Sequence, residues 1–386
     1  AGVNGSGKHN NWSLTSDDGV NLLEPGKNPH ENKMFLLVLA CILKAVDEHA
    51  DLLRVSAADV GNDQRLGGNE APPAVISVFL GDQLEDVLDQ ILKNGEATHS
   101  IKGEKFATGV TTLPDFRKDA TDRNRTSPFA FTGNKFEFRM LGSQDSLSNC
   151  NVVLNTIAAE AFEEACDRLE KAEDFDKELN ALIVEYTEKH KRIIFSGNGY
   201  SKEWQEEAKR RGLPNLPTMV DAIPALTTDA AIDMFEHFKV FTKAELSARA
   251  EIQYEIYAKA INIEARTMID MATKQIIPAV VKYTTVLAES VNQVRAAGGN
   301  YNVSVQERLL EKTSALLAES YEALNHLAEV TAEIEKKEEG PERAGYCLDV
   351  IMPAMTELRT PVDALEMIVD KEMWPMPSYG DLMFIL

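Results

Sequence analysis

Two long helical patterns constrain the fold of this chain more than any other feature of its sequence. Lys243–Ala297 and Ser304–Lys336 carry apolar residues every three or four positions, which is the period of an α-helix. The turn sequence Ala-Gly-Gly-Asn separates them, and Pro278 predicts a kink or break inside the first. The two stretches are therefore expected to form an antiparallel hairpin with coiled-coil-like packing.

The sequence as a whole changes character near residue 145. Residues 1–145 mix expected helices, loops and short β-branched or aromatic segments, and Phe136–Met140 alternates as a strand that sends Glu137 and Arg139 to one face. Residues 146–386 are predicted to be mainly helical, with a Pro-containing linker at Gly212–Met219 and a Pro-containing tail at Trp374–Leu386. The further expected elements are helices at Asn32–Ala50, Gln83–Lys93, Asn149–Lys171 and Asp174–Arg192, a loop at Asp59–Ala74, a strand or helix start at Ala74–Leu80, and a helix at Cys347–Asp370 interrupted at Pro353 and Pro361. This pattern predicts an α+β fold in two parts.

Composition excludes several classes of function. The chain has 40 Lys and Arg against 62 Asp and Glu, a formal net charge of −22, so nucleic acid and anionic membranes are not expected partners. No apolar run approaches the roughly 20 residues of a membrane span. Four widely spaced cysteines without a Cys-x-x-Cys motif are read as reduced, buried thiols of a cytoplasmic protein: Cys41, Cys150, Cys166 and Cys347.

Gly2–Ser13 is the first segment that could carry chemistry. Its glycines allow backbone N–H groups to approach anionic oxygens closely. Gly7 and Lys8 match part of a nucleotide-binding P-loop, but His9 stands where that motif needs Ser or Thr. We therefore reject the P-loop and keep His9 as a metal ligand, with a flexible surface turn as the alternative.

Two further segments concentrate charge. Asp63–Pro73 presents Arg65, suited to a bidentate grip on a carboxylate, and Glu70, suited to a flap or base; a solvated ion pair is the alternative. Asp122–Arg139 clusters cations beside phenylalanines, which suits binding of a polyanion, with Glu137 as a Mg²⁺ ligand. A salt-bridged strand edge remains the alternative reading of that cluster.

In this order, the three segments resemble the glutamine synthetase family. Four motifs are similar to the family's signatures: the Asn-Gly-Ser-Gly-x-His pattern ending at His9, the Arg65–Glu70 loop, the Arg-Asn-Arg sequence and the Lys-Phe-Glu-Phe-Arg sequence. Within the family, the sequence around these motifs is most similar to the long type III enzymes. The resemblance implies that residues 1–145 are the C-terminal part of the family's catalytic domain, with antiparallel or mixed strands and helices. Residues 146–386 would be an all-helical C-terminal region.

The resemblance also implies a reaction and its participants. ATP-dependent ligation of ammonia to L-glutamate, through a γ-glutamyl phosphate, would give glutamine, ADP and phosphate. The implied cofactor is Mg²⁺ or Mn²⁺, and the implied assembly is a homo-oligomer in rings, a dodecamer. The implied roles are glutamate binding by Asn4, Gly5 and Arg65; metal binding by His9 and Glu137; ATP binding by Asn11, Ser13, Arg123, Arg125 and Lys135; and catalysis by Glu70, Arg125 and Arg139.

The chain departs from the family's short forms in ways that affect the ATP contacts. Those forms have His at Asn11 and Arg at Ala130 and Lys135, and their Arg-to-Glu flap spacing is one residue longer. Other metal-binding glutamates of the family precede the Asn-Gly-Ser-Gly segment. The chain is therefore expected to be the C-terminal portion of a larger enzyme, inactive by itself. Two alternatives stay open: another carboxylate–amine ligase, or a helical assembly protein with an incomplete site.

Overall fold

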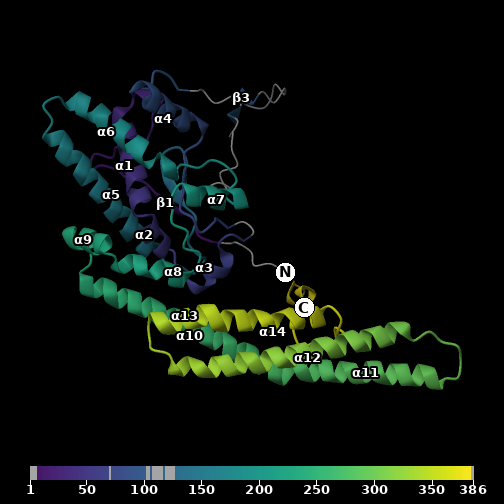
Figure 1. Cartoon of the computed structure of the whole chain (residues 1–386). Helices are drawn as coiled ribbons and strands as arrows, with labels where there is room; N and C mark the ends of the chain where they lie inside the picture. The colour runs from purple at the N-terminus through teal and green to yellow at the C-terminus, as the bar shows by residue number, and fades with distance from the viewer. Residues whose placement is uncertain (1–6, 69–70, 101–104, 107–115, 118–126, 384–386) are drawn as a thin grey trace. The chain divides into compact units, whose positions relative to one another are not determined.

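The computed structural model of the chain describes residues 7–68, 71–100, 105–106, 116–117 and 127–383 (Figure 1). The chain forms two compact units, Ala1–Ala250 and Glu251–Leu386. The last strand of the sheet, β6 (Phe136–Phe138), is followed by α5 (Leu147–Glu170), and the division of the chain into two domains near residue 145 stays a prediction. Along the sequence, the boundary between the two compact units falls between Ala250 and Glu251, within α10 (Lys243–Met271).

A small mixed sheet lies in the first unit. Its strand order is β1-β6-β5-β2, with β1 (Asn10–Trp12), β6 and β5 (Phe129–Phe131) antiparallel and β2 (Val78–Phe79) parallel to β5. β3 (Lys105–Phe106) and β4 (Phe116–Arg117) form a separate antiparallel pair. The expected α+β class, with antiparallel and mixed strands, is confirmed.

Alternation along β6 separates the core from the polar face of the sheet. Phe136 and Phe138 are completely buried, and the Phe136 ring stacks on Phe129 with centroids 4.5 Å apart. Glu137, between them, points away from this aromatic cluster, as its strand position predicts. The phenylalanines therefore fix the strand whose opposite face carries Glu137.

The helices of the first unit pack against one another and against this sheet. α1 (Lys33–Glu48) begins at Asn32, whose side chain accepts a hydrogen bond from the Phe35 N–H, and it packs against both α5 and α6 (Phe175–His190). The Phe35 ring meets Phe131 of the sheet at 5.8 Å. The other helices are α2 (Ala50–Val55), α3 (Val60–Arg65), α4 (Asp82–Asn94), α7 (Lys202–Arg210), α8 (Met219–Ala222), α9 (Asp229–His237) and the 3₁₀ segments Pro29–Glu31, Lys191–Ile193 and Ile223–Thr227.

Two local expectations for this unit were wrong. Residues 59–74 are not all loop, because Asp59 caps the short helix α3 through a hydrogen bond from the Gly61 N–H. Cys166 is exposed, whereas Cys41, Cys150 and Cys347 are buried as expected. Burial raises the pKa of the Cys41 and Cys150 thiols to about 12, so both stay protonated at neutral pH.

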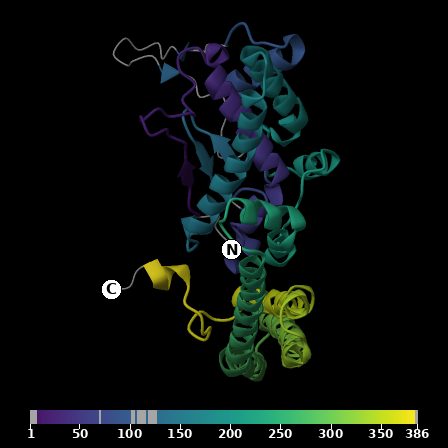
Figure 2. The same cartoon turned by 90° about the vertical axis from the view of Figure 1, so that its left-hand side faces the viewer.

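The second unit contains the predicted hairpin. α11 (Ile277–Ala296) and α12 (Ser304–Ala332) lie side by side in both views (Figures 1 and 2), and α14 (Met352–Glu366) packs along α12 as well. The buried core of this packing includes Ile276, Val280, Leu365 and Val369. Its other elements are the 3₁₀ segment Glu333–Lys336, α13 (Pro341–Tyr346) and α15 (Tyr379–Met383).

Prolines shape the helices of this unit in two ways. A π-helical turn, Ala272–Ile276, ends two residues before Pro278, and another, Cys347–Ile351, ends two residues before Pro353. A wider turn relieves the clash between a proline ring and the preceding turn, so both breaks fall near their expected positions. The interruption expected at Pro361 is wrong: Pro361 lies inside α14 and is buried, and packing keeps the helix continuous. Within the described residues, no helix is long and apolar enough to cross a membrane.

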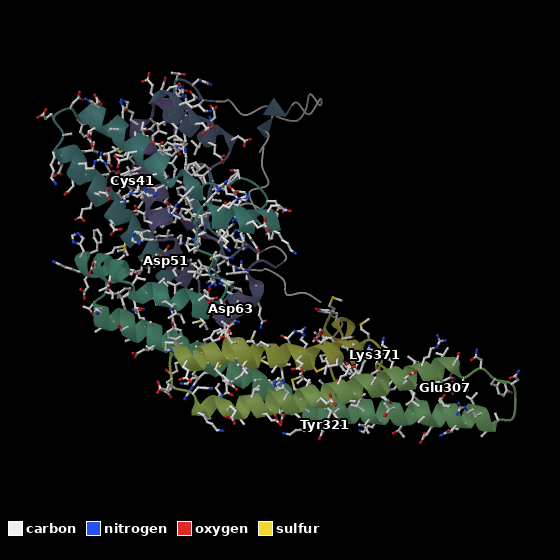
Figure 3. All side chains as sticks on the ribbon, in the orientation of Figure 1. Cys41, Asp51, Asp63, Glu307, Tyr321 and Lys371 are labelled. Atoms are coloured by element: carbon white, nitrogen blue, oxygen red, sulfur yellow. The ribbon has the colours of Figure 1, made fainter. Side chains whose placement is uncertain are left out.

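Asp63 of α3, labelled in Figure 3, should make the folding stability of the first unit depend on pH. Its carboxylate accepts a 2.7 Å hydrogen bond from the Met219 N–H and lies 3.9 Å from Arg54. Burial nevertheless raises its pKa from 3.8 to about 7. The folded chain therefore binds a proton that the unfolded chain has released, and this contribution to stability is lost as the pH rises from about 4 to 7.

We expect Asp63→Asn, which keeps the acceptor for Met219, to remove that dependence. In urea unfolding at several pH values, the variant should gain stability relative to wild type as the pH rises. Asp17→Asn, at an exposed carboxyl group, is the matched control. A difference between Asp63→Asn and wild type that is the same at pH 5 and pH 8 would contradict this assignment.

Candidate active site

The pairing of β1 with β6 creates the polar face on which the candidate site lies. Asn11 pairs with Glu137, whereas Asn10 and Trp12 are buried on the opposite side. Asn10 Nδ2 donates to Asn151 Oδ1 (2.8 Å) and Trp12 Nε1 donates to Asn155 Oδ1 (2.9 Å). These two bonds to α5 fix which face of β1 is buried, and they leave the face of Asn11 open.

His9 and Glu137 meet at this face. His9 Nδ1 lies 2.8 Å from Glu137 Oε1, although the two residues are 128 positions apart. The side chains are 52% and 14% exposed, respectively, so the imidazole is open to solvent while the carboxylate is held by the sheet. An imidazole and a carboxylate in contact are a donor set that fits a divalent cation.

This pair does not form a complete metal site. Among the residues that the structure describes, no group of three or more His, Cys, Asp or Glu side chains could hold an ion. A Mg²⁺ or Ca²⁺ ion takes six or more ligands, so water, substrate or further carboxylates must supply the rest.

Three of the residues expected to contact ATP lie next to or within the same strands: Asn11, Ser13 and Lys135. Asn11 and Ser13 are exposed, and Asn11 Nδ2 lies 3.5 Å from the His9 carbonyl. Lys135 is half-buried and lies in the turn between β5 and β6, where its carbonyl accepts a 2.8 Å hydrogen bond from the Thr132 N–H. Their roles in nucleotide binding stay predictions.

The Arg139 side chain is buried and does not lie on the open face of the sheet. Its guanidinium donates to the Ser127 carbonyl, and its backbone N–H donates to the Pro128 carbonyl at 2.9 Å. Only 5% of the residue is exposed. Arg139 therefore ties the end of β6 to the segment that enters β5, and its predicted contact with a transferring phosphoryl group stays untested.

Arg65 is likewise buried among backbone carbonyls. At the end of α3, its Nη1 donates to the Met140 carbonyl (2.8 Å) and to Asn62 Oδ1 (3.1 Å), while Nη2 lies 3.2 Å from the Arg139 carbonyl. Burial lowers the pKa of this guanidinium, and the carboxylate of Asp145 opposes the shift. The expected glutamate contact of Arg65 stays a prediction.

Five of the predicted site residues fall outside the described residues. They are Asn4, Gly5, Glu70, Arg123 and Arg125. Their predicted roles in binding glutamate, holding phosphates and closing the site are therefore unchanged.

Sequence reasoning missed Asn62. It is 1% exposed, and its Nδ2 donates to the Ala57 carbonyl (2.6 Å) and to the Met140 carbonyl (3.0 Å). A signal was present, because Asp59 is a good helix N-cap and Asn62 precedes Arg65 by one helical turn. Recognising that cap would have placed Asn62 and Arg65 on one face of a helix.

Comparison with known proteins connects this geometry to a family. Residues 178–295 match the model described as the glutamine synthetase C-terminal domain. A "Type-3 glutamine synthetase" of Dictyostelium discoideum is 41% identical over 100% of this chain and 53% of its own length. Glutamine synthetases of Butyrivibrio fibrisolvens and Bacteroides fragilis are 41% and 37% identical over 55% and 54% of their lengths.

This chain is related to the glutamine synthetases. The resemblance that its sequence motifs indicate, including that to the type III form, is confirmed over the whole chain. The chain spans about half the length of these curated relatives. The helical region named by the family model runs from within α6 to the end of α11.

Proposed function

We propose that the protein containing this chain joins ammonia to L-glutamate with hydrolysis of ATP, giving glutamine, ADP and phosphate. The contact between His9 and Glu137 carries this proposal, because it unites the two side chains that the family motifs mark as metal ligands. The relatives' names support the same reaction class.

The reaction requires two anions to approach each other. In the proposed first step, a γ-carboxylate oxygen of glutamate attacks the γ-phosphorus of ATP and ADP leaves, which forms γ-glutamyl phosphate. Ammonia then attacks the carbonyl carbon, phosphate leaves, and one proton is released from the attacking nitrogen. A divalent cation bound by His9 and Glu137, Mg²⁺ or Mn²⁺, would neutralise charge on the phosphates during the first step.

The chain's own residues would orient the reactants. Asn11, Ser13 and Lys135 would contact the nucleotide from the open side of β1 and β6, and Arg139 would support the transferring phosphoryl group. We assign glutamate binding to Asn4, Gly5 and Arg65, phosphate binding to Arg123 and Arg125, and to Glu70 the removal of a proton from ammonium. Excluding water protects the acyl phosphate from hydrolysis, which is the chemical reason for a closing loop.

Besides water and substrate, the cation needs further side-chain ligands. We propose that other parts of the full-length protein, or a neighbouring subunit in a homo-oligomeric ring such as a dodecamer, provide them. The buried, unpaired thiols agree with a cytoplasmic setting.

Substrate-dependent ATP turnover by the full-length protein tests the function. We expect ADP release to require both glutamate and ammonium, with glutamine as the product. Methylamine and ethylamine as acceptors, and aspartate as the acid, serve as comparisons. Faster turnover with another amine or acid would favour a different carboxylate–amine ligase, and no turnover with any pair would favour the helical assembly protein.

A further inference from the structure

The surroundings of Arg65 suggest a second role, in addition to the glutamate binding that the family motif implies. Arg65 is 6% exposed, and its guanidinium donates to the carbonyls of Met140 and Arg139, immediately after β6. Met140 and Arg139 follow Glu137 by only a few positions. Arg65 thus joins α3 to the strand that holds one member of the His9–Glu137 pair.

The other side of the same guanidinium touches the segment that holds His9. A Cβ atom added to Gly7 would lie 2.1 Å from Arg65 Nη2 and 2.6 Å from the Leu141 carbonyl oxygen. The backbone of Gly7 therefore lies against the guanidinium, with no space for a side chain between them. Next to it, the Lys8 N–H donates to the same Leu141 carbonyl at 3.0 Å, and Gly7 forms a bridge with Gly142.

Asn62 and Asp145 support this arrangement. Asn62 Oδ1 accepts from Arg65, and Asn62 Nδ2 shares the Met140 carbonyl with it, so the guanidinium has a fixed orientation. Asp145 accepts a 2.7 Å bond from the Gly142 N–H, while its own backbone carbonyl accepts from Lys8 Nζ at 2.5 Å. The backbones before His9 and after Glu137 are thus locked together around one side chain.

We propose that Arg65 is a positioning residue that sets the spacing of His9 and Glu137 for a divalent cation. A planar guanidinium offers several N–H donors in a fixed arrangement and can bond two carbonyls at once, which a compact ammonium group does with less geometric control. Loss of either the guanidinium or the glycine should let the segment bearing His9 shift relative to β6. The inference deepens the proposed function, on which its catalytic meaning rests.

Mn²⁺ titration of the chain, followed by NMR, provides the test. Bound Mn²⁺ broadens nearby imidazole signals, so weak binding by a two-ligand site is observable. The chain has seven histidines, and the His9 signal is assigned by its absence in His9→Gln. The Mn²⁺ concentration that half-broadens this signal is then compared among variants.

Arg65→Lys and Gly7→Ala should each raise that concentration about tenfold, the loss typical of disturbing groups that orient metal ligands. Arg211→Lys is the matched control: Arg211 is an arginine of the same unit whose Nη1 donates to the carbonyls of Arg192 (3.2 Å) and Ile194 (2.8 Å). Gly345→Ala, where an added Cβ meets nothing within 4 Å, is the control for the glycine. Both controls should match wild type.

Kinetics of the full-length enzyme separate the two roles of Arg65. If Arg65→Lys and Gly7→Ala leave the Mn²⁺ midpoint unchanged, and Arg65→Lys raises only the KM for glutamate, the positioning role is wrong and the guanidinium serves the substrate. A shifted Mn²⁺ midpoint in a protein whose wild type makes no glutamine would support the positioning role and refute the proposed function.

Discussion

Glu137→Gln should lower the rate of glutamine formation by the full-length enzyme by about 10²–10³-fold, as expected for removing one charged group from a preorganised site. Glutamine keeps the shape of the side chain and its place on β6, but it lacks the negative charge that would hold the proposed divalent cation beside His9. ADP release at saturating ATP, glutamate and ammonium measures the loss.

The matched control is Glu96→Gln, which neutralises an exposed carboxylate that follows α4 in the same unit. It should retain the wild-type rate. Raising the Mg²⁺ or Mn²⁺ concentration should restore part of the activity of Glu137→Gln, because the lost charge contributes to cation binding. A wild-type rate in Glu137→Gln at limiting Mg²⁺ would exclude Glu137 from the metal site.

Asp47→Ala should have the largest effect on the stability of the first unit. The carboxylate of Asp47 and the imidazole of His190 are both 2% exposed and lie 2.8 Å apart, and Arg192 Nε also donates to Asp47 at 2.9 Å. These contacts join α1 to the end of α6. Removing the carboxylate leaves the buried ring nitrogen of His190 without its hydrogen-bond partner, which costs about 1–3 kcal/mol, and it also removes the charge that Arg192 pairs with.

We place the expected loss at about 3 kcal/mol, with little added by Arg192, since Arg192 is 44% exposed and water will replace part of its bond. Urea unfolding of the chain measures the loss. Asp167→Ala, which breaks an exposed pair with Lys171 on one helix, is the control and should cost less than about 1 kcal/mol. Equal losses in the two variants would show that the pairing of Asp47 with α6 adds no stability.

Long periodic segments could be predicted from the sequence because burial of one face determines them. The pattern that ends at Lys336 became α12 and a 3₁₀ turn, and Phe136–Phe138 became a strand with Glu137 on the polar face. Short elements were harder to predict. α3 depends on a single capping residue, Asp59, and the continuity of α14 through Pro361 depends on packing that periodicity does not reveal.

The sequence predicted which residues belong to the candidate site better than it predicted the contacts that they make. Family motifs selected His9 and Glu137, and the register of β1 with β6 places them together. The same motifs gave no sign that Arg65 and Arg139 would be buried against backbone carbonyls. Those bonds depend on where the chain turns after Met140, a tertiary feature that residue spacing does not specify.

Transfer of oxygen from glutamate to phosphate tests the central claim most directly. The full-length enzyme is supplied with ATP, ammonium and glutamate labelled with ¹⁸O in its γ-carboxylate, and the released phosphate is examined by mass spectrometry. Formation of γ-glutamyl phosphate predicts one ¹⁸O atom in each phosphate released, because the attacking carboxylate oxygen leaves with the phosphoryl group. Unlabelled phosphate released together with glutamine would contradict the proposed reaction.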